Sequence, residues 1–302
     1  MALTDNMRGA ALMAFAMLVF AVNDTCMKLV LGELPLFQSV LIRGLLTSVA
    51  LVLIAPRLGG LRFRISRRDA MLVALRSLSE VLATVTFLTA LRHMPFANLS
   101  AIMQALPLAV TLAAALFLGE AVGWRRLAAI ATGFVGVLLI VQPGADGFTV
   151  WSLLGLASVA CVVLRDLSTR RLSSDVTSVT VSLSAAASVT IMAACAAPFE
   201  GWAPVAPRHL VLIAAASGFL IAGYLTIVMA MRVGEISLVA PFRYTALLFS
   251  ILLGWMVFGE FPGSLILIGG AIVVGSGIYT FYRERRLGQK VAAPPKAELR
   301  IR

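Results

Sequence analysis

The sequence has 302 residues, of which 60% are hydrophobic and only 13% are charged, and its mean hydropathy is +0.98. Because a soluble domain usually carries about 25% charged residues, this composition excludes a soluble globular fold and indicates an all-α protein with several membrane-spanning helices. The formal net charge of +11 does not indicate nucleic-acid binding, because the placement of the basic residues explains it as a topology signal.

Ten segments of the chain are long and apolar enough to cross a membrane core of about 30 Å as helices. Each is bounded by turn residues or charges. Pro35 and Pro95 stand where two of these helices begin, a position that tolerates the missing N–H of proline. The expected spans cover residues 8–30, 35–55, 69–91, 95–118, 124–142, 149–168, 176–198, 208–231, 235–258 and 263–282.

The lysines and arginines predict how these spans are oriented. Most of the 25 basic residues fall on the side of the N-terminus, whereas the opposite side receives only Lys28, Arg92 and Arg208. Because cytoplasmic loops carry the excess of basic residues, we expect an integral protein of a bacterial-type inner membrane with both termini in the cytoplasm.

A long internal repeat divides the chain. Residues 90–123 recur at 230–263 without a gap, from an Ala-x-Arg at one end to a Gly-Glu-x-x-Gly at the other. Each half holds an odd number of spans, so the second half enters the membrane upside down, as in transporters built from inverted repeats. The predicted division is a first five-helix repeat at 1–143, an inverted repeat at 144–286 and a basic, largely disordered cytoplasmic tail at 287–302.

Two polar repeat partners, Gln104 and Tyr244, lie near the middle of the membrane, each about 14 Å from the start of its helix. A polar side chain at this depth faces protein or water, so both are candidates for lining a central cavity. The alternative is that they bond neighbouring helices as packing contacts. Pro107 and Pro241 interrupt the same two helices, which favours a bent cavity lining over plain kinks.

Arg243 is a candidate for binding an anionic group of a ligand. It lies about 12 Å from the cytoplasmic side, and its own predicted helix offers no obvious acidic partner. Snorkelling of the long side chain to the membrane interface is the alternative.

Three charges form a predicted cluster in the second and third spans. Glu80 and Arg43 lie at similar depths, and Arg76 precedes Glu80 by one helical turn. Two interpretations stay open: the cluster locks the two helices together, or Glu80 exchanges a proton while an arginine binds a substrate carboxylate. Thr84 and Asn98 complete the candidate substrate-binding residues.

Charge pairs at the membrane edges are candidates for a structural or a gating role. Asp24 and Lys28 stand one turn apart in the first span, and Asp166 and Arg170 repeat this spacing in the sixth. Glu120 and Glu260 close the fourth and ninth spans at opposite faces, where each caps a loop or forms part of a gate.

No catalytic or metal-binding motif emerges from the sequence. Cys26, Cys161 and Cys195 lie in apolar runs without paired spacing and are expected to be core residues. The H-E-x-x-H and Gly-x-Ser-x-Gly patterns are absent, so we predict neither enzymatic activity nor a cofactor. The glycine-rich spans 124–142 and 263–282 are candidates for a homodimer contact or for scaffold packing.

Four stretches carry a resemblance to a known family. They are PLFQSVLIRG (35–44), ALRHMPFAN (90–98), LFLGE (116–120) and APFRYTALLFSILLGWMVFGEFP (240–262). They resemble the EamA family of the drug/metabolite transporter superfamily, in which Arg43 and Pro107 match a family arginine and proline. The resemblance implies a carrier with a central cavity lined by helices 1, 3, 4, 6, 8 and 9. The halves have diverged, since Leu220 stands at the repeat position of Glu80.

The family likeness implies a secondary transporter that exports amino acids, including aromatic ones, by alternating access. Its partners are then a small-molecule substrate and the lipid bilayer. The alternative is an uptake carrier for S-adenosylmethionine or carboxylates; a channel and an intramembrane enzyme are the alternatives from other classes. Proton coupling and uniport are both compatible with the sequence.

Overall fold

The computed structural model describes residues 3–58, 60–61, 65–119, 123–143, 149–173, 175–233 and 239–292. Throughout these residues the regular structure is helical, and ten helical segments are long and apolar enough to cross a membrane. The elements are α1 (Leu3–Leu31), α2 (Leu36–Ile54), η1 (Ala55–Leu58), α3 (Arg67–His93), α4 (Phe96–Met103), α5 (Leu106–Leu118), α6 (Trp124–Val141), α7 (Val150–Arg170), α8 (Ser178–Glu200), α9 (Pro207–Val233), η2 (Ala240–Tyr244), α11 (Thr245–Phe258) and α12 (Ser264–Ala292). The predicted all-α class and the ten spans are confirmed.

The fourth and ninth spans are each built from two helical pieces. In the fourth span the backbone turns at Gln104 and Ala105, between α4 and α5. Pro107 follows at once and has no N–H to offer the carbonyl of the preceding turn, so the hydrogen-bond ladder stops there. In the ninth span, Pro241 lies in the 3-10 helix η2 that precedes α11. The expected interruptions therefore fall in both repeated helices.

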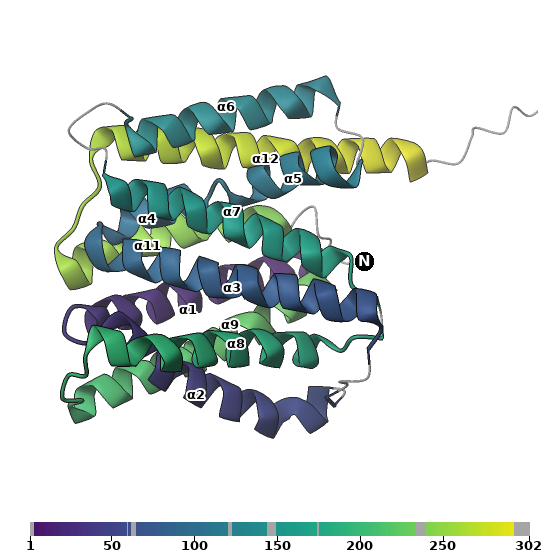
Figure 1. Cartoon of the computed structure of the whole chain (residues 1–302). Coiled ribbons are helices and arrows are strands. Elements are labelled where there is room, and N and C mark those ends of the chain that lie inside the picture. The colour runs from purple at the N-terminus through teal and green to yellow at the C-terminus, as the bar shows by residue number, and fades with distance from the viewer. Residues whose placement is uncertain are drawn as a thin grey trace, which may run out of the picture.

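Helix α1 begins and helix α12 ends at the same end of the bundle (Figure 1). We call this end the terminal face and the opposite end the distal face. Successive spans alternate in direction, so the short connections after α1, α3, α8 and α11 lie at the distal face (Figure 1).

The main contacts between helices are symmetric: each of them has an equivalent when the two inverted halves are exchanged. Helix α1 packs along α9, and its repeat counterpart α7 packs along α3 in the same way. Helix α2 packs on α8, and α6 packs on α12. The two helices of each pair hold the same position in their halves, so each pair maps onto itself when the halves are exchanged. An odd number of spans in each half gives the two halves opposite orientations, which confirms the architecture of two inverted five-helix repeats.

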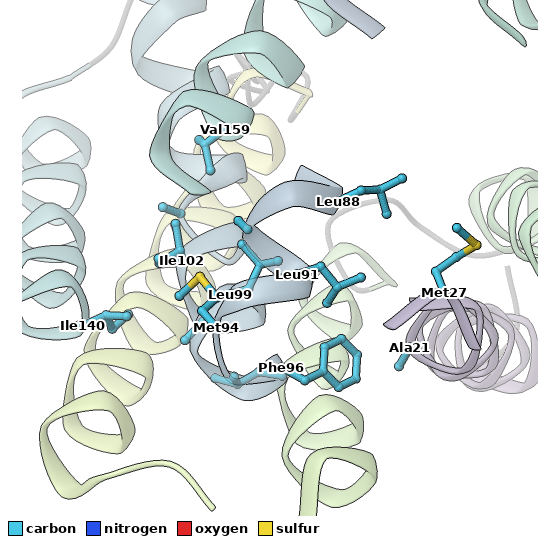
Figure 2. Packing of buried hydrophobic residues seen from close by; sticks show 14 of the residues in the cluster. Ala21, Met27, Leu88, Leu91, Met94, Phe96, Leu99, Ile102, Ile140 and Val159 are labelled. Carbon is cyan, nitrogen blue, oxygen red and sulfur yellow. The ribbon is translucent and has the colours of Figure 1, made fainter. Parts of the chain in front are cut away.

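The largest apolar core lies in the distal half of the bundle. It joins the end of α1 to the junction of α3 and α4, and it reaches α6 and α7 (Figure 2). Its fully buried members include Met27, Leu31, Leu88, Leu91, Phe96, Leu99 and Ile102. This packing leaves the distal side of the bundle closed.

Glycines hold α6 and α12 in close contact. A Cβ at Gly136 would lie 2.7 Å from the backbone oxygen of Gly269, and a Cβ at Gly269 would lie 2.6 Å from that of Gly136. Both are nearer than a methyl group can approach a backbone atom. These glycines therefore support the scaffold interpretation of the glycine-rich spans.

Replacing Gly136 with valine is expected to destabilise the protein by about 1–3 kcal/mol, because the added side chain collides with the backbone of α12. Gly275 on α12 is the matched control, since a Cβ there meets no atom within 4 Å. Thermal unfolding of Gly136→Val and Gly275→Val in the same detergent checks this; equal melting temperatures for the two variants would contradict the packing described.

Two predictions need correction or fall outside the described residues. Helix α12 continues to Ala292, so residues 287–292 of the predicted tail are helical. Residues 293–302 and Glu120 lie outside the described part of the chain.

Candidate functional site

Charged side chains meet between α3 and α7 inside the bundle. The Oε2 atom of Glu80 lies 3.7 Å from Nη2 of Arg76 on the same helix and 3.5 Å from Nη1 of Arg165 on α7. Arg165 also contacts Oδ1 of its neighbour Asp166 at 2.9 Å. The side chains of Glu80, Arg76 and Arg165 are only 15–21% exposed, so these charges compensate one another away from bulk water.

Further charges extend this cluster in two directions. Towards α1 and α2, the guanidinium of Arg43 interacts electrostatically first with Asp24 and more weakly with Glu80. Towards η2, Arg243 interacts with Asp166. We call the whole set the ionic network. Among the described residues it comprises Asp24, Arg43, Arg76, Glu80, Arg165, Asp166 and Arg243.

The composition of the ionic network corrects one expectation from the sequence. Arg76 and Glu80 are paired as predicted, but the second direct partner of Glu80 is Arg165, and Arg43 faces Asp24 instead. The four arginines and three carboxylates of the network leave a formal excess of one positive charge, which suits a site for an anionic or zwitterionic ligand.

Tyr224 on α9 lies at the centre of the ionic network. It interacts electrostatically with Glu80, Arg165, Arg76 and Arg43, which belong to three other helices. Its side chain is nevertheless 51% exposed. Tyr224 is therefore a half-exposed side chain beside the charges of several helices, and Arg243, which is also exposed, lies near Asp166 and Arg165 of the same network.

Tyr244 and Gln104 lie elsewhere than expected. Tyr244 is 4% exposed, and its hydroxyl packs on Gly277 of α12, where a Cβ would lie 1.7 Å from it. Gln104 is 6% exposed at the end of α4. Residues 243 and 244 are adjacent but face different neighbours, because each residue turns a helix by about 100°.

The two remaining candidates from the sequence occupy intermediate positions. Thr84 is half-buried on α3, one turn beyond Glu80. Asn98 is half-buried on α4, and within the described part of the chain its Oδ1 is buried without a hydrogen-bond partner. Tyr224 was not among the residues predicted from the sequence, although Thr84 corresponds to it in the internal repeat. Tyr224 stands at its repeat position, 140 residues later, so the internal repeat contained the signal.

A set of contacts that we call the distal lock closes the distal end of α1. Nζ of Lys28 lies 2.9 Å from Oε1 of Glu260 and donates to the carbonyl of Met94 at 2.8 Å. Oε2 of Glu260 accepts from the backbone N–H of Phe96 at 2.9 Å, at the start of α4. Glu260 therefore caps a helix, one of the roles expected for it.

The distal lock replaces the charge pair predicted within α1. The long Lys28 side chain reaches across to Glu260 after α11, while Asp24 accepts from Nδ2 of Asn23 at 2.8 Å and faces Arg43. In α7, Asp166 pairs with the adjacent Arg165. The i, i+4 spacing makes the pair of Asp24 and Lys28 available, but Lys28 binds Glu260 beyond α11 instead.

Two more carboxylates, neither of which was predicted from the sequence, connect helices at the distal face. Glu200 accepts from the backbone N–H groups of Leu36 and Phe37 at 2.8 and 2.6 Å, which caps α2. Glu33 pairs with Arg208 and lies 2.8 Å from Nε2 of His209. Within the described residues, His, Cys, Asp and Glu side chains form no group that could hold a metal ion.

Comparison with known proteins gives concordant similarities. Residues 7–142 match the EamA-like transporter family. The chain is 30% identical to a riboflavin transporter of Vibrio cholerae over 75% of this chain and 77% of that protein. It is 25% identical to a pseudopaline exporter of Pseudomonas aeruginosa over 88% and 93%, and 22% identical to an S-adenosylmethionine uptake transporter of Rickettsia conorii over 94% and 96%.

A crystal structure that is 20% identical in sequence shares the fold. It superposes with a TM-score of 0.62 over 93% of this chain and 99% of that one.

Proposed function

Because the chain belongs to the EamA-like transporter family and is therefore a small-molecule transporter of the membrane, we propose that it exports a zwitterionic metabolite of the amino-acid type. The export runs across a bacterial-type inner membrane, with the terminal face in the cytoplasm. The ionic network is the observation that carries this proposal, since it brings guanidinium and carboxylate groups together between the helices.

Arg243 and Asp166 supply the two complementary charges. Arg243 is exposed and interacts electrostatically with Asp166. A substrate carboxylate can bind the guanidinium in a forked geometry, while its ammonium group replaces that guanidinium beside Asp166. Binding of the substrate then replaces the interaction of Arg243 with Asp166 by two ion pairs. Tyr224 offers a ring and a hydroxyl beside the same charges.

Glu80 is assigned a structural part in this site. It lies between Arg76 and Arg165 on two different helices, which supports the interpretation that it positions arginines. In this proposal transport depends on the charge of the substrate and not on a charge change of Glu80.

Alternating access follows from the two inverted halves. The distal core and the distal lock hold the described conformation closed at the distal face. Release at that face requires the halves, 1–143 and 144–286, to rock so that Lys28 leaves Glu260.

Uptake of S-adenosylmethionine or of a carboxylate is the second candidate. The similarity to the Rickettsia uptake transporter, which extends over nearly the full length of both chains, favours it. S-adenosylmethionine also carries an amino-acid group, so the same pair of charges would recognise it.

Counterflow into proteoliposomes identifies the substrate. Vesicles are loaded with an unlabelled amino acid, a dicarboxylate, riboflavin or S-adenosylmethionine, and each set is exposed to a trace of the same compound in labelled form. We expect exchange with amino acids, including aromatic ones, and none with riboflavin. Exchange confined to S-adenosylmethionine or to dicarboxylates would replace the first candidate by the second, and non-saturating flux would indicate a channel.

Substitution of the two tyrosines is expected to have different effects: one variant loses stability and the other loses substrate binding. Tyr244→Ala empties the contact with Gly277 and should cost about 3–5 kcal/mol of stability, as for other large aromatic side chains. Tyr224→Ala removes a half-exposed side chain, so it should leave the melting temperature nearly unchanged and weaken substrate binding. Melting curves with and without substrate measure both effects; the reverse pattern would place Tyr244 in the cavity after all.

A further inference from the structure

An apolar groove opens on the outside of the bundle between α3, α5 and α7. Its volume is about 620 Å³, within the range of about 300–1,000 Å³ that is usual for small-molecule sites. The walls include Leu75, Leu116, Phe117, Phe134, Ala160 and Leu164. Leu116 and Phe117 are 68% and 69% exposed, so the groove faces the surroundings of the protein and not its core.

The groove is separate from the ionic network. On α7 its lining residues Ala160, Val163, Leu167 and Arg171 recur at helical spacing and define one face. Arg165, which contacts Glu80, is turned away from that face by roughly half a rotation at about 100° per residue. One side of α7 therefore carries charges of the ionic network, and the other side lines the groove, which faces the membrane.

One end of the groove is cationic. Arg171 lies in the lining at the end of α7, on the terminal face, and its side chain is exposed. Its Nη2 donates to the carbonyl of Phe117 at 2.9 Å, which fixes the guanidinium over the end of α5 and leaves other N–H donors available. A guanidinium held in this way suits a phosphate group.

The dimensions of the groove fit one leaflet of a bilayer. From Arg171 to Leu156, both of which line it, α7 rises about 22 Å, more than half of a hydrocarbon core of about 30 Å. The cation thus lies at headgroup level, and the apolar walls extend inward to the depth of acyl chains.

We propose that this groove binds an anionic phospholipid of the leaflet at the terminal face, with the phosphate on Arg171 and an acyl chain along α7. The complementary charge at one end and the apolar lining elsewhere together favour a lipid over a second copy of this chain, which would have to bury the cation in its interface.

Native mass spectrometry of the full-length protein tests the proposal with two probes, phosphatidylglycerol and phosphatidylcholine. The wild type is expected to retain phosphatidylglycerol about fivefold better, from the roughly 1 kcal/mol that one arginine contributes near an anionic headgroup. Arg171→Gln should abolish this preference, because the amide carries no charge and the guanidinium held over Phe117 is lost.

Filling the groove should displace the lipid altogether. Ala160→Trp introduces a large ring at an exposed lining position, and Ile191→Trp on α8, which is 64% exposed and outside the groove, is the matched control. Retention of both lipids should fall at least fivefold in the first variant only.

Equal retention of the two lipids by the wild type, or a preference that survives Arg171→Gln, would overturn the proposal. A dimer in lipid-free protein that Ala160→Trp abolishes would assign the groove to a second copy instead. If Ala160→Trp does not fold, Arg171→Gln still decides, because it changes one exposed charge.

Discussion

Arg243→Ala is expected to weaken substrate binding by about 10- to 100-fold, since a hydrogen-bonded contact with a charged group contributes roughly 1.5–3 kcal/mol. The reason is that Arg243 is the exposed guanidinium of the ionic network and faces Asp166. The apparent dissociation constant from substrate-dependent melting shifts measures the effect, and counterflow should fall in parallel.

Two further variants make this result specific. Arg243→Lys keeps the charge but loses the planar fork, so it should recover only part of the affinity. Arg208→Ala, at the distal surface where Arg208 pairs with Glu33, should bind substrate as the wild type does. Unchanged binding in Arg243→Ala would remove this residue from the site.

Lys28→Met is expected to release the distal face. Lys28 is only 10% exposed and makes the ion pair with Glu260 as well as a hydrogen bond to Met94. The loss of such a contact should shift the balance towards a state that is open at the distal face by about 10- to 100-fold. The native thiol of Cys26, 9% exposed in the distal core, reports the opening through its rate of modification by a maleimide.

The measurement requires Cys161→Ser and Cys195→Ser in the background, so that Cys26 is the thiol that reacts. Arg208→Met is the control, because its pair with Glu33 lies at the surface, with 63% and 47% of the two side chains exposed, and surface pairs contribute about 0–1 kcal/mol. Modification of Cys26 at the same rate in wild type and Lys28→Met would show that the distal lock does not hold this face closed.

The sequence was sufficient for the features that depend on one helix at a time. Apolar runs predicted the ten spans, and Pro107 and Pro241 predicted where two of them are interrupted. The internal repeat and the odd number of spans in each half predicted the inverted architecture.

Features that depend on which helices are neighbours were not accessible in the same way. Glu80 was expected to meet Arg43, but the packing of α3 along α7 brings Arg165 to it. Lys28 was expected to meet Asp24, yet Glu260 from the other half lies closer. A pattern in one helix shows which charges need partners, and only the packing decides which partners they find.

The direction in which a side chain faces was the second feature that could not be predicted from the sequence. Tyr244 and Arg243 are adjacent, but the phenol packs on Gly277 while the guanidinium faces the ionic network. Hydrophobic periodicity normally resolves such a choice, but in spans that are apolar on every side it carries little information.

A comparison of an accepted amino acid with its carboxamide in one binding experiment tests the central claim, that the ionic network recognises a substrate carboxylate. The two ligands have nearly the same shape and differ in the charge that Arg243 is proposed to bind. We predict that the amino acid raises the melting temperature of the wild-type protein, that the amide does so only at about 10- to 100-fold higher concentration, and that Arg243→Ala removes the difference. Equal shifts with both ligands in the wild type would contradict this recognition.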